Sequence, residues 1–128
     1  MASFLQPLLR QPDRAWTLVN ADTGSRVVGR ITAAVDSASR NRGLLGRTGL
    51  DDEALVIAPC NAVHTFFMKF AIDILFVDKA GTIVKVVPAV GPWRLAMAFR
   101  GFATIEMAAG TAARTDTRSG HRLELQAS

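Results

Sequence analysis

Short apolar runs alternate with turn-forming residues along most of the chain, and this pattern predicts a succession of β-strands. The runs are rich in β-branched and aromatic residues, and glycine, proline, asparagine or aspartate separates them. Strands are expected over residues 16–19, 26–31, 54–58, 63–68, 72–77, 82–87, 102–107 and 122–125. Because strand follows strand with little room for crossover helices, we expect a mainly β fold, a single small antiparallel barrel-like or sandwich-like domain.

Two hairpins are indicated by the turns between these runs. The first joins residues 16–19 to residues 26–31 across a polar turn that contains Gly24. The second joins residues 72–77 to residues 82–87 across Asp78-Lys79-Ala80-Gly81, in which glycine can supply a positive φ. The second hairpin is the clearest local feature of the sequence.

Helices are expected to be short and few. Asp36 or Ser37 can cap a helix within residues 36–47, and the glycines in this segment weaken its continuation. Residues 110–120 are predicted to form a turn or a single helical turn. The sequence therefore predicts one or two short helices beside the sheet.

The length of 128 residues matches one domain. Residues 1–14 are polar, interrupted by proline and without periodicity, so we expect a loosely packed N-terminal arm ahead of a single β-rich domain over residues 15–128. No run approaches the roughly 20 apolar residues of a membrane span, and no secretory signal is evident. A single cysteine, Cys60, excludes an internal disulfide. These features predict a cytoplasmic protein.

The net charge of +4 is compatible with an anionic partner. Six arginines fall into two local groups, which are Arg40, Arg42 and Arg47, and Arg114, Arg118 and Arg122. Nucleic-acid association through these groups is therefore one hypothesis. Nucleic-acid-binding surfaces usually interleave clustered basic residues with exposed aromatic residues, and here most phenylalanines fall in apolar strands. A nucleic-acid partner is accordingly not the favoured one.

Three polar residues in one short apolar segment are the strongest candidates for a binding site. His64 can donate or accept a proton near neutral pH, and Lys69 can hold an anion. Asp73 lies in a strand that is apolar on both faces, where an unpaired carboxylate is costly. It either pairs with Arg42 or Arg47, accepts hydrogen bonds from backbone N–H groups, or lines a pocket.

Trp93 follows a loop that contains two prolines and a glycine. It either forms the lip of a binding groove or closes one end of the sheet structure. Together with Arg42, it completes the set of candidate ligand-binding residues.

Cys60 precedes His64 by four residues, and a nucleophile and base built from this pair is a second functional hypothesis. Such pairs are defined by their geometry in space rather than by sequence spacing. No metal site is expected, because the few histidines and the cysteine lack the paired spacing of metal ligands. No cofactor is expected either, because the chain lacks glycine-rich phosphate-binding loops.

An ordered set of segments resembles the domain-of-unknown-function 192 family. The segments are Arg42-Gly43-Leu44-Leu45-Gly46-Arg47, His64-Thr65-Phe66-Phe67-Met68-Lys69, Ile72-Asp73-Ile74-Leu75-Phe76-Val77-Asp78 and Glu106-Met107-Ala108-Ala109-Gly110. The resemblance implies a compact, mostly β single domain, and it implies no established activity. We therefore expect a non-enzymatic binding or accessory domain for a small molecule or a peptide, with the Cys60–His64 enzyme and the nucleic-acid hypothesis as alternatives.

Overall fold

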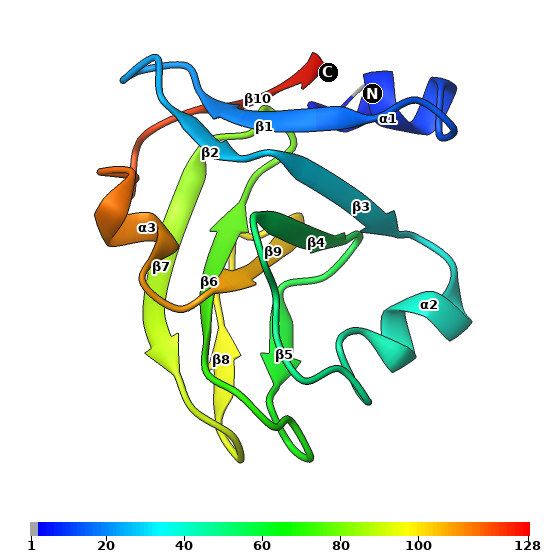
Figure 1. Ribbon diagram of the computed structural model, residues 1–128, viewed down its shortest axis with the longest axis vertical. Coiled ribbons are helices and arrows are strands. Elements are labelled where there is room, and N and C mark those ends of the chain that lie inside the picture. The colour runs from blue at the N-terminus through cyan, green and yellow to red at the C-terminus, as the bar shows by residue number, and fades with distance from the viewer. Residues whose placement is uncertain (1–2) are drawn as a thin grey trace.

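The computed structural model describes residues 3–128, apart from the side chains of Asn41 and Arg42, and it is mainly β (Figure 1). The strands are β1 (Trp16–Asn20), β2 (Arg26–Val28), β3 (Arg30–Ala34), β4 (Glu53–Ile57), β5 (Ala62–His64), β6 (Ile72–Val77), β7 (Ile83–Val90), β8 (Leu95–Met97), β9 (Ala103–Ala108) and β10 (Leu123–Ala127). The helices are α1 (Gln6–Arg10), α2 (Ser37–Arg42) and α3 (Thr111–Arg114). The expected mainly β single domain is confirmed.

A five-stranded sheet in the order β3-β4-β9-β6-β7 forms the centre of the domain. Every residue of β6 is buried, which explains why its sequence is apolar on both faces. The pairs β4–β9, β9–β6 and β6–β7 are antiparallel, as expected, but β3 and β4 are parallel. This departure arises because α2 and the loop after it carry the chain back to the start of the sheet edge before β4 begins.

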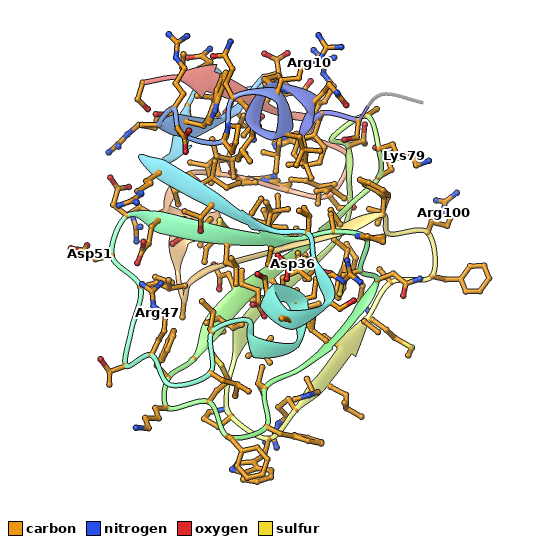
Figure 2. All side chains as sticks on the ribbon, turned by 90° about the vertical axis from the view of Figure 1, so that its right-hand side faces the viewer. Arg10, Asp36, Arg47, Asp51, Lys79 and Arg100 are labelled. Atoms are coloured by element: carbon orange, nitrogen blue, oxygen red, sulfur yellow. The ribbon has the colours of Figure 1, made fainter. Side chains whose placement is uncertain are left out.

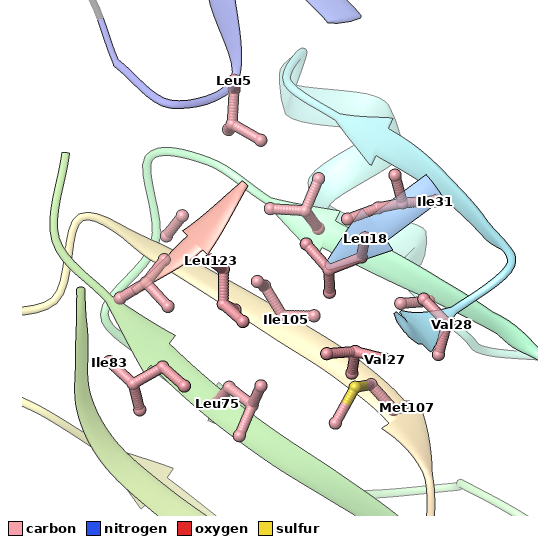
Figure 3. Packing of buried hydrophobic residues seen from close by; sticks show 14 of the residues in the cluster. Leu5, Leu18, Val27, Val28, Ile31, Leu75, Ile83, Ile105, Met107 and Leu123 are labelled. Carbon is pink, nitrogen blue, oxygen red and sulfur yellow. The ribbon is translucent and has the colours of Figure 1, made fainter. Parts of the chain in front are cut away.

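The main core lies between the central sheet and a three-stranded sheet in the order β10-β1-β2. Figure 3 shows Leu18 and Val27 of the smaller sheet packed over Leu75, Ile105 and Met107 of the central sheet. These side chains are at most 4% exposed. Burial of each contributes about 1.5–3 kcal/mol, so this interface is the main source of stability.

The N-terminal segment is not the loosely packed arm that its sequence suggested. Its residues form α1, and Leu5 and Leu8 belong to the main core. The two leucines are three positions apart, so one helical turn places both on the same side. The backbone N–H of Phe4 also donates to the carbonyl of Lys79 at 2.7 Å.

Local predictions succeeded where a turn or a cap fixes the conformation. Strands β6 and β7 form the expected hairpin, and Asp36, labelled in Figure 2, accepts the backbone N–H of Ser39 at the start of α2. The prediction of one strand over residues 63–68 was wrong, because β5 ends at His64 and Phe67 has a φ of 66°. Strand β8, which pairs with β5 in a separate two-stranded sheet, was not expected.

Candidate functional site

A pocket of about 290 Å³ lies between the end of α2, the segment that joins β4 to β5, and strand β9. Apolar side chains, Leu44 and Met68 among them, form part of its walls. Four polar side chains also line it, from α2, the β4–β5 segment, β5 and β9; they are Arg40, Cys60, His64 and Glu106. We refer to it as the Glu106 pocket.

A larger hollow of about 650 Å³ lies between α1 and β3. Apolar side chains such as Leu8 and Ile31 line it, and the charged Asp13 and Arg30 at its edge are exposed to solvent. Ligand sites usually combine apolar walls with a few converging polar groups. The described lining of this hollow includes no buried ionisable side chain, so the Glu106 pocket is the better candidate.

Glu106 is the central residue of the pocket. It lies in β9 between Ile105 and Met107, which point into the main core, so its own side chain points to the other face of the sheet. Its neighbours across the sheet are Leu55 of β4 and Ile74 of β6, and Glu106 is only 5% exposed. The apolar surroundings of the carboxyl group therefore come directly from the strand sequences.

Burial raises the pKa of Glu106 from 4.5 to about 7, because the charged form loses its hydration. Among the side chains that the structure describes, none offsets this loss through a hydrogen bond or an ion pair. Glu106 therefore keeps its proton to a higher pH than an ordinary glutamate does, and its side chain lines the pocket. The sequence analysis missed Glu106, although a single charged residue in the apolar run 103–108 was a usable signal.

His64 stands at the rim of the pocket, as the last residue of β5. Its Nδ1 accepts the backbone N–H of Phe66 at 3.2 Å, and the two rings lie 4.9 Å apart. Because Nδ1 is an acceptor here, the proton of the neutral ring is carried by Nε2. His64 can thus donate a hydrogen bond from an exposed position beside the pocket.

Cys60 reaches the pocket from the β4–β5 segment. Its Sγ donates to the carbonyl of Ala62 at 3.2 Å, and its own carbonyl accepts the hydroxyl of Thr104 at 3.0 Å. Within the described part of the chain, no hydrogen bond joins Cys60 to His64. The two residues share a pocket without forming the nucleophile–base contact of a catalytic pair.

Asp73 is 1% exposed, and both carboxylate oxygens accept backbone hydrogen bonds. Oδ1 accepts the N–H of Ala89 and Oδ2 accepts the N–H of Ala112, each at 2.9 Å. Ala89, with a φ of 49°, lies in a bulge of β7, where the pairing with β6 skips from Ile72 to Ile74. Of the three roles that the sequence left open, backbone bonding is the one observed, and Asp73 joins this bulge to the start of α3.

Trp93 is connected to His64 by a row of aromatic rings, in which Phe66 lies between the two. The ring of Phe66 stacks on Trp93 at 5.4 Å, and Phe67 meets Trp93 edge-on at 4.7 Å. Lys69 is exposed on the same loop as Phe67. The structure thus gathers His64 and Trp93 around Phe66, whereas Asp73 lies away from them among the bulge and α3.

Arg42, the remaining candidate, ends α2, and its side chain lies outside the described residues. Several other members of the two arginine groups pair with nearby carboxylates. These pairs are Arg47–Glu53, Arg118–Asp116 and Arg122–Glu124. Exposed pairs of this kind contribute about 0–1 kcal/mol each, but they balance part of the positive charge locally.

Two further findings concern metals and membranes. Across residues 3–128, no three histidine, cysteine, aspartate or glutamate side chains are placed so that they could hold a metal ion. None of the three helices described is long and apolar enough to cross a membrane.

The fold and the Glu106 pocket together define a small β-rich domain with a buried carboxyl group facing a pocket. The chain belongs to the domain-of-unknown-function 192 family, described as an uncharacterized ACR, whose model matches residues 18–125. No match was found among curated proteins.

Two solved structures have a similar fold. One, of a protein of unknown function from Novosphingobium aromaticivorans DSM 12444, is 24% identical over 86% of this chain and 83% of its own, with a TM-score of 0.74. The other, from Sinorhizobium meliloti 1021 and described as a "putative transcription regulator", is 22% identical over 87% of this chain and 92% of its own, with a TM-score of 0.76. At these identities the likeness concerns the fold.

Proposed function

We propose that the protein is a non-enzymatic binding domain whose ligand enters the Glu106 pocket and donates a hydrogen bond or a positive charge to Glu106. The observation that carries the proposal is Glu106, a residue that is 5% exposed, lines the pocket and has no partner among the described side chains. A buried carboxylate is costly unless it is paired. An ammonium, guanidinium or hydroxyl group of a ligand would supply that partner.

The dimensions of the pocket limit the ligand to a small molecule or a single side chain of a peptide. Its volume of about 290 Å³ is at the lower end of the usual range for ligand pockets, roughly 300–1,000 Å³. The apolar wall that includes Leu44 and Met68 would contact an aliphatic portion of the ligand. The Nε2–H of His64 at the rim would bind an acceptor on the same molecule.

A thermal-shift screen tests this proposal. The probes are alkylamines, amino acids, polyamines and guanidino compounds, with metals, nucleotides and sugars in the same panel. A ligand at a hundredfold excess over its Kd stabilises the folded state by about 2.7 kcal/mol. We expect a shift with at least one amine or guanidino compound, loss of that shift in Glu106→Gln, and a smaller shift in His64→Ala.

Glu124→Gln is the matched control, since Glu124 lies in β10 and pairs with Arg122 away from the pocket. It should bind as the wild type does. A ligand that stabilises wild type and Glu106→Gln equally would place its site elsewhere, and no shift with any probe would leave the Glu106 pocket without a small-molecule role.

The second candidate, an enzyme, is favoured by one observation: Cys60, His64 and Glu106 line the same pocket. A catalytic thiolate is alkylated rapidly near neutral pH. Under the binding proposal, we expect iodoacetamide to react with Cys60 at the rate of an ordinary free thiol, and His64→Ala to leave that rate unchanged. Fast alkylation that depends on His64 would instead favour the enzyme.

The proposal retains the cytoplasmic location expected from the sequence, with which the free thiol of Cys60 is consistent. Nucleic-acid association through the arginine groups remains an alternative. The pairing of Arg47, Arg118 and Arg122 with neighbouring carboxylates gives it little support.

A further inference from the structure

We propose that the end of the molecule formed by the loop after β5, the loop before β8 and β8 itself docks onto an anionic lipid surface. Four large apolar side chains are exposed there, and we call them the apolar tip. They are Phe67 at 68%, Trp93 at 56%, Leu95 at 76% and Met97 at 66% exposure. This surface is separate from the interior of the Glu106 pocket and does not depend on it.

The two loops of the apolar tip are held together by one buried residue, Thr65, which is 1% exposed. Its backbone N–H donates to the carbonyl of Arg94 at 2.9 Å, and its carbonyl accepts the N–H of Trp93 at 3.0 Å. Its hydroxyl donates to the carbonyl of Gly91 at 2.7 Å and accepts the N–H of Arg94 at 2.9 Å. The aromatic side chains are therefore presented from a fixed double loop.

Two residues of the apolar tip have backbone conformations that bulky side chains rarely adopt. Phe67 has a φ of 66° and Trp93 a φ of 65°. For large side chains this left-handed region is strained, and such strain persists mainly at functional sites. Here the strained residues point two aromatic rings, 4.7 Å apart, towards solvent rather than into the core. Strain combined with exposed apolar surface indicates that this end has a binding role.

The charges around the apolar tip identify the partner. The sequence contains no aspartate or glutamate between Asp78 and Glu106, and between Glu53 and Asp78 the one acid is the buried Asp73. The exposed charged residues in these stretches on and beside the apolar tip are basic, and they are Lys69, Lys85, Arg94 and Arg100. Figure 2 shows Arg100 projecting from the side of the molecule above β8.

Exposed aromatic and aliphatic residues interleaved with lysine and arginine match the boundary between anionic headgroups and acyl chains. Tryptophan is favoured at this boundary because its ring is apolar and its N–H is polar. Each basic residue near an anionic membrane contributes about 1 kcal/mol, which corresponds to roughly fivefold in affinity. A protein partner would have to be apolar and acidic over the same area, whereas a lipid surface combines both properties.

Co-sedimentation of the full chain with vesicles tests the proposal. We expect binding to vesicles of phosphatidylcholine and phosphatidylserine, little binding to phosphatidylcholine alone, weaker binding at high salt, and a blue shift of tryptophan fluorescence that is lost in Trp93→Phe. The double variant Lys69→Gln/Arg94→Gln should bind roughly 25-fold more weakly, from about fivefold for each charge.

The double variant Phe67→Asn/Trp93→Asn separates docking from folding. Asparagine tolerates a positive φ, so this variant should unfold at the same urea concentration as the wild type or at a higher one. It should nevertheless lose at least tenfold in vesicle affinity. Leu9→Asn is the matched control, since Leu9 is 43% exposed on α1 at the opposite end of the molecule, and it should bind like the wild type.

Three results would overturn the proposal. One is no binding to anionic vesicles at low salt. Another is binding that Phe67→Asn/Trp93→Asn leaves unchanged. The third is a concentration-dependent dimer that this variant abolishes, seen together with the absence of vesicle binding, because the apolar tip would then be an interface between two copies of the chain.

Discussion

Replacing Asp73 by asparagine should destabilise the protein by about 3 kcal/mol. The two oxygens of Asp73 accept the N–H groups of Ala89 and Ala112 in a site that is 1% exposed. Asparagine offers one acceptor oxygen, and its NH₂ group would face a backbone donor that has lost its partner. The bulge of β7 and the start of α3 would both lose their connection to β6.

Urea denaturation of Asp73→Asn measures this effect directly. Asp51→Asn is the control, because Asp51 is exposed in the loop before β4 and should change the free energy of unfolding by less than about 0.5 kcal/mol. If Asp73→Asn is as stable as the control, the two backbone hydrogen bonds do not have the structural role assigned to them. Asp73 would then have to be reconsidered as a ligand-binding residue.

Replacing Glu106 by glutamine should stabilise the protein at high pH, which is the opposite effect. The folded-state pKa of about 7 is higher than the ordinary value of 4.5, so the folded protein binds this proton more tightly than the unfolded chain does. The contribution of Glu106 to stability is therefore fully present below about pH 4.5 and is lost as the pH rises through 7. The loss amounts to about 3 kcal/mol, since one pKa unit corresponds to about 1.4 kcal/mol.

The measurement is the free energy of unfolding of wild type and Glu106→Gln as a function of pH. Taking the difference between the two proteins cancels the titration of the other carboxylates. We expect the free energy of unfolding of the variant to rise relative to that of the wild type between about pH 4.5 and pH 7. Above that range it should stay higher than that of the wild type. A difference that stays constant with pH would mean that the Glu106 carboxylate is solvated or paired in the folded protein.

Above about pH 7, Glu106→Gln is thus expected to be more stable than the wild type, and it should be unable to bind the ligand. A residue that costs stability and is needed for binding is typical of a functional site. Asp73→Asn should lose stability instead. The two substitutions therefore distinguish a binding carboxylate from a structural one within the same central sheet.

The sequence alone could not make this distinction. Asp73 and Glu106 are both single acids in apolar strands, and the pattern of each strand is compatible with a buried carboxylate in either role. What separates them is the backbone of distant segments: the bulge at Ala89 and the N–H of Ala112 reach Asp73, while β9 directs Glu106 at a pocket. From the sequence, Asp73 was counted among the candidate ligand-binding residues, with structural roles left open, because His64 and Lys69 are near it in the chain.

In the fold, too, features set by neighbouring residues could be predicted, whereas features set by distant residues could not. The β6–β7 hairpin and the start of α2 depend on residues close together in the chain, and both were predicted correctly. The end of β5 depends on Thr65, whose hydrogen bonds run to Gly91 and Arg94, more than twenty positions away. The β-forming residues after His64 therefore suggested a longer strand than the one that forms.

The most direct test of the account is the pKa of Glu106 itself. NMR of the side-chain carboxyl carbon can follow its titration in the free protein, with Glu106→Gln used to assign the signal. We expect a midpoint near pH 7 in the free protein. A midpoint near the ordinary value of 4.5 would mean that Glu106 is already hydrated or paired, and would contradict the proposed binding site.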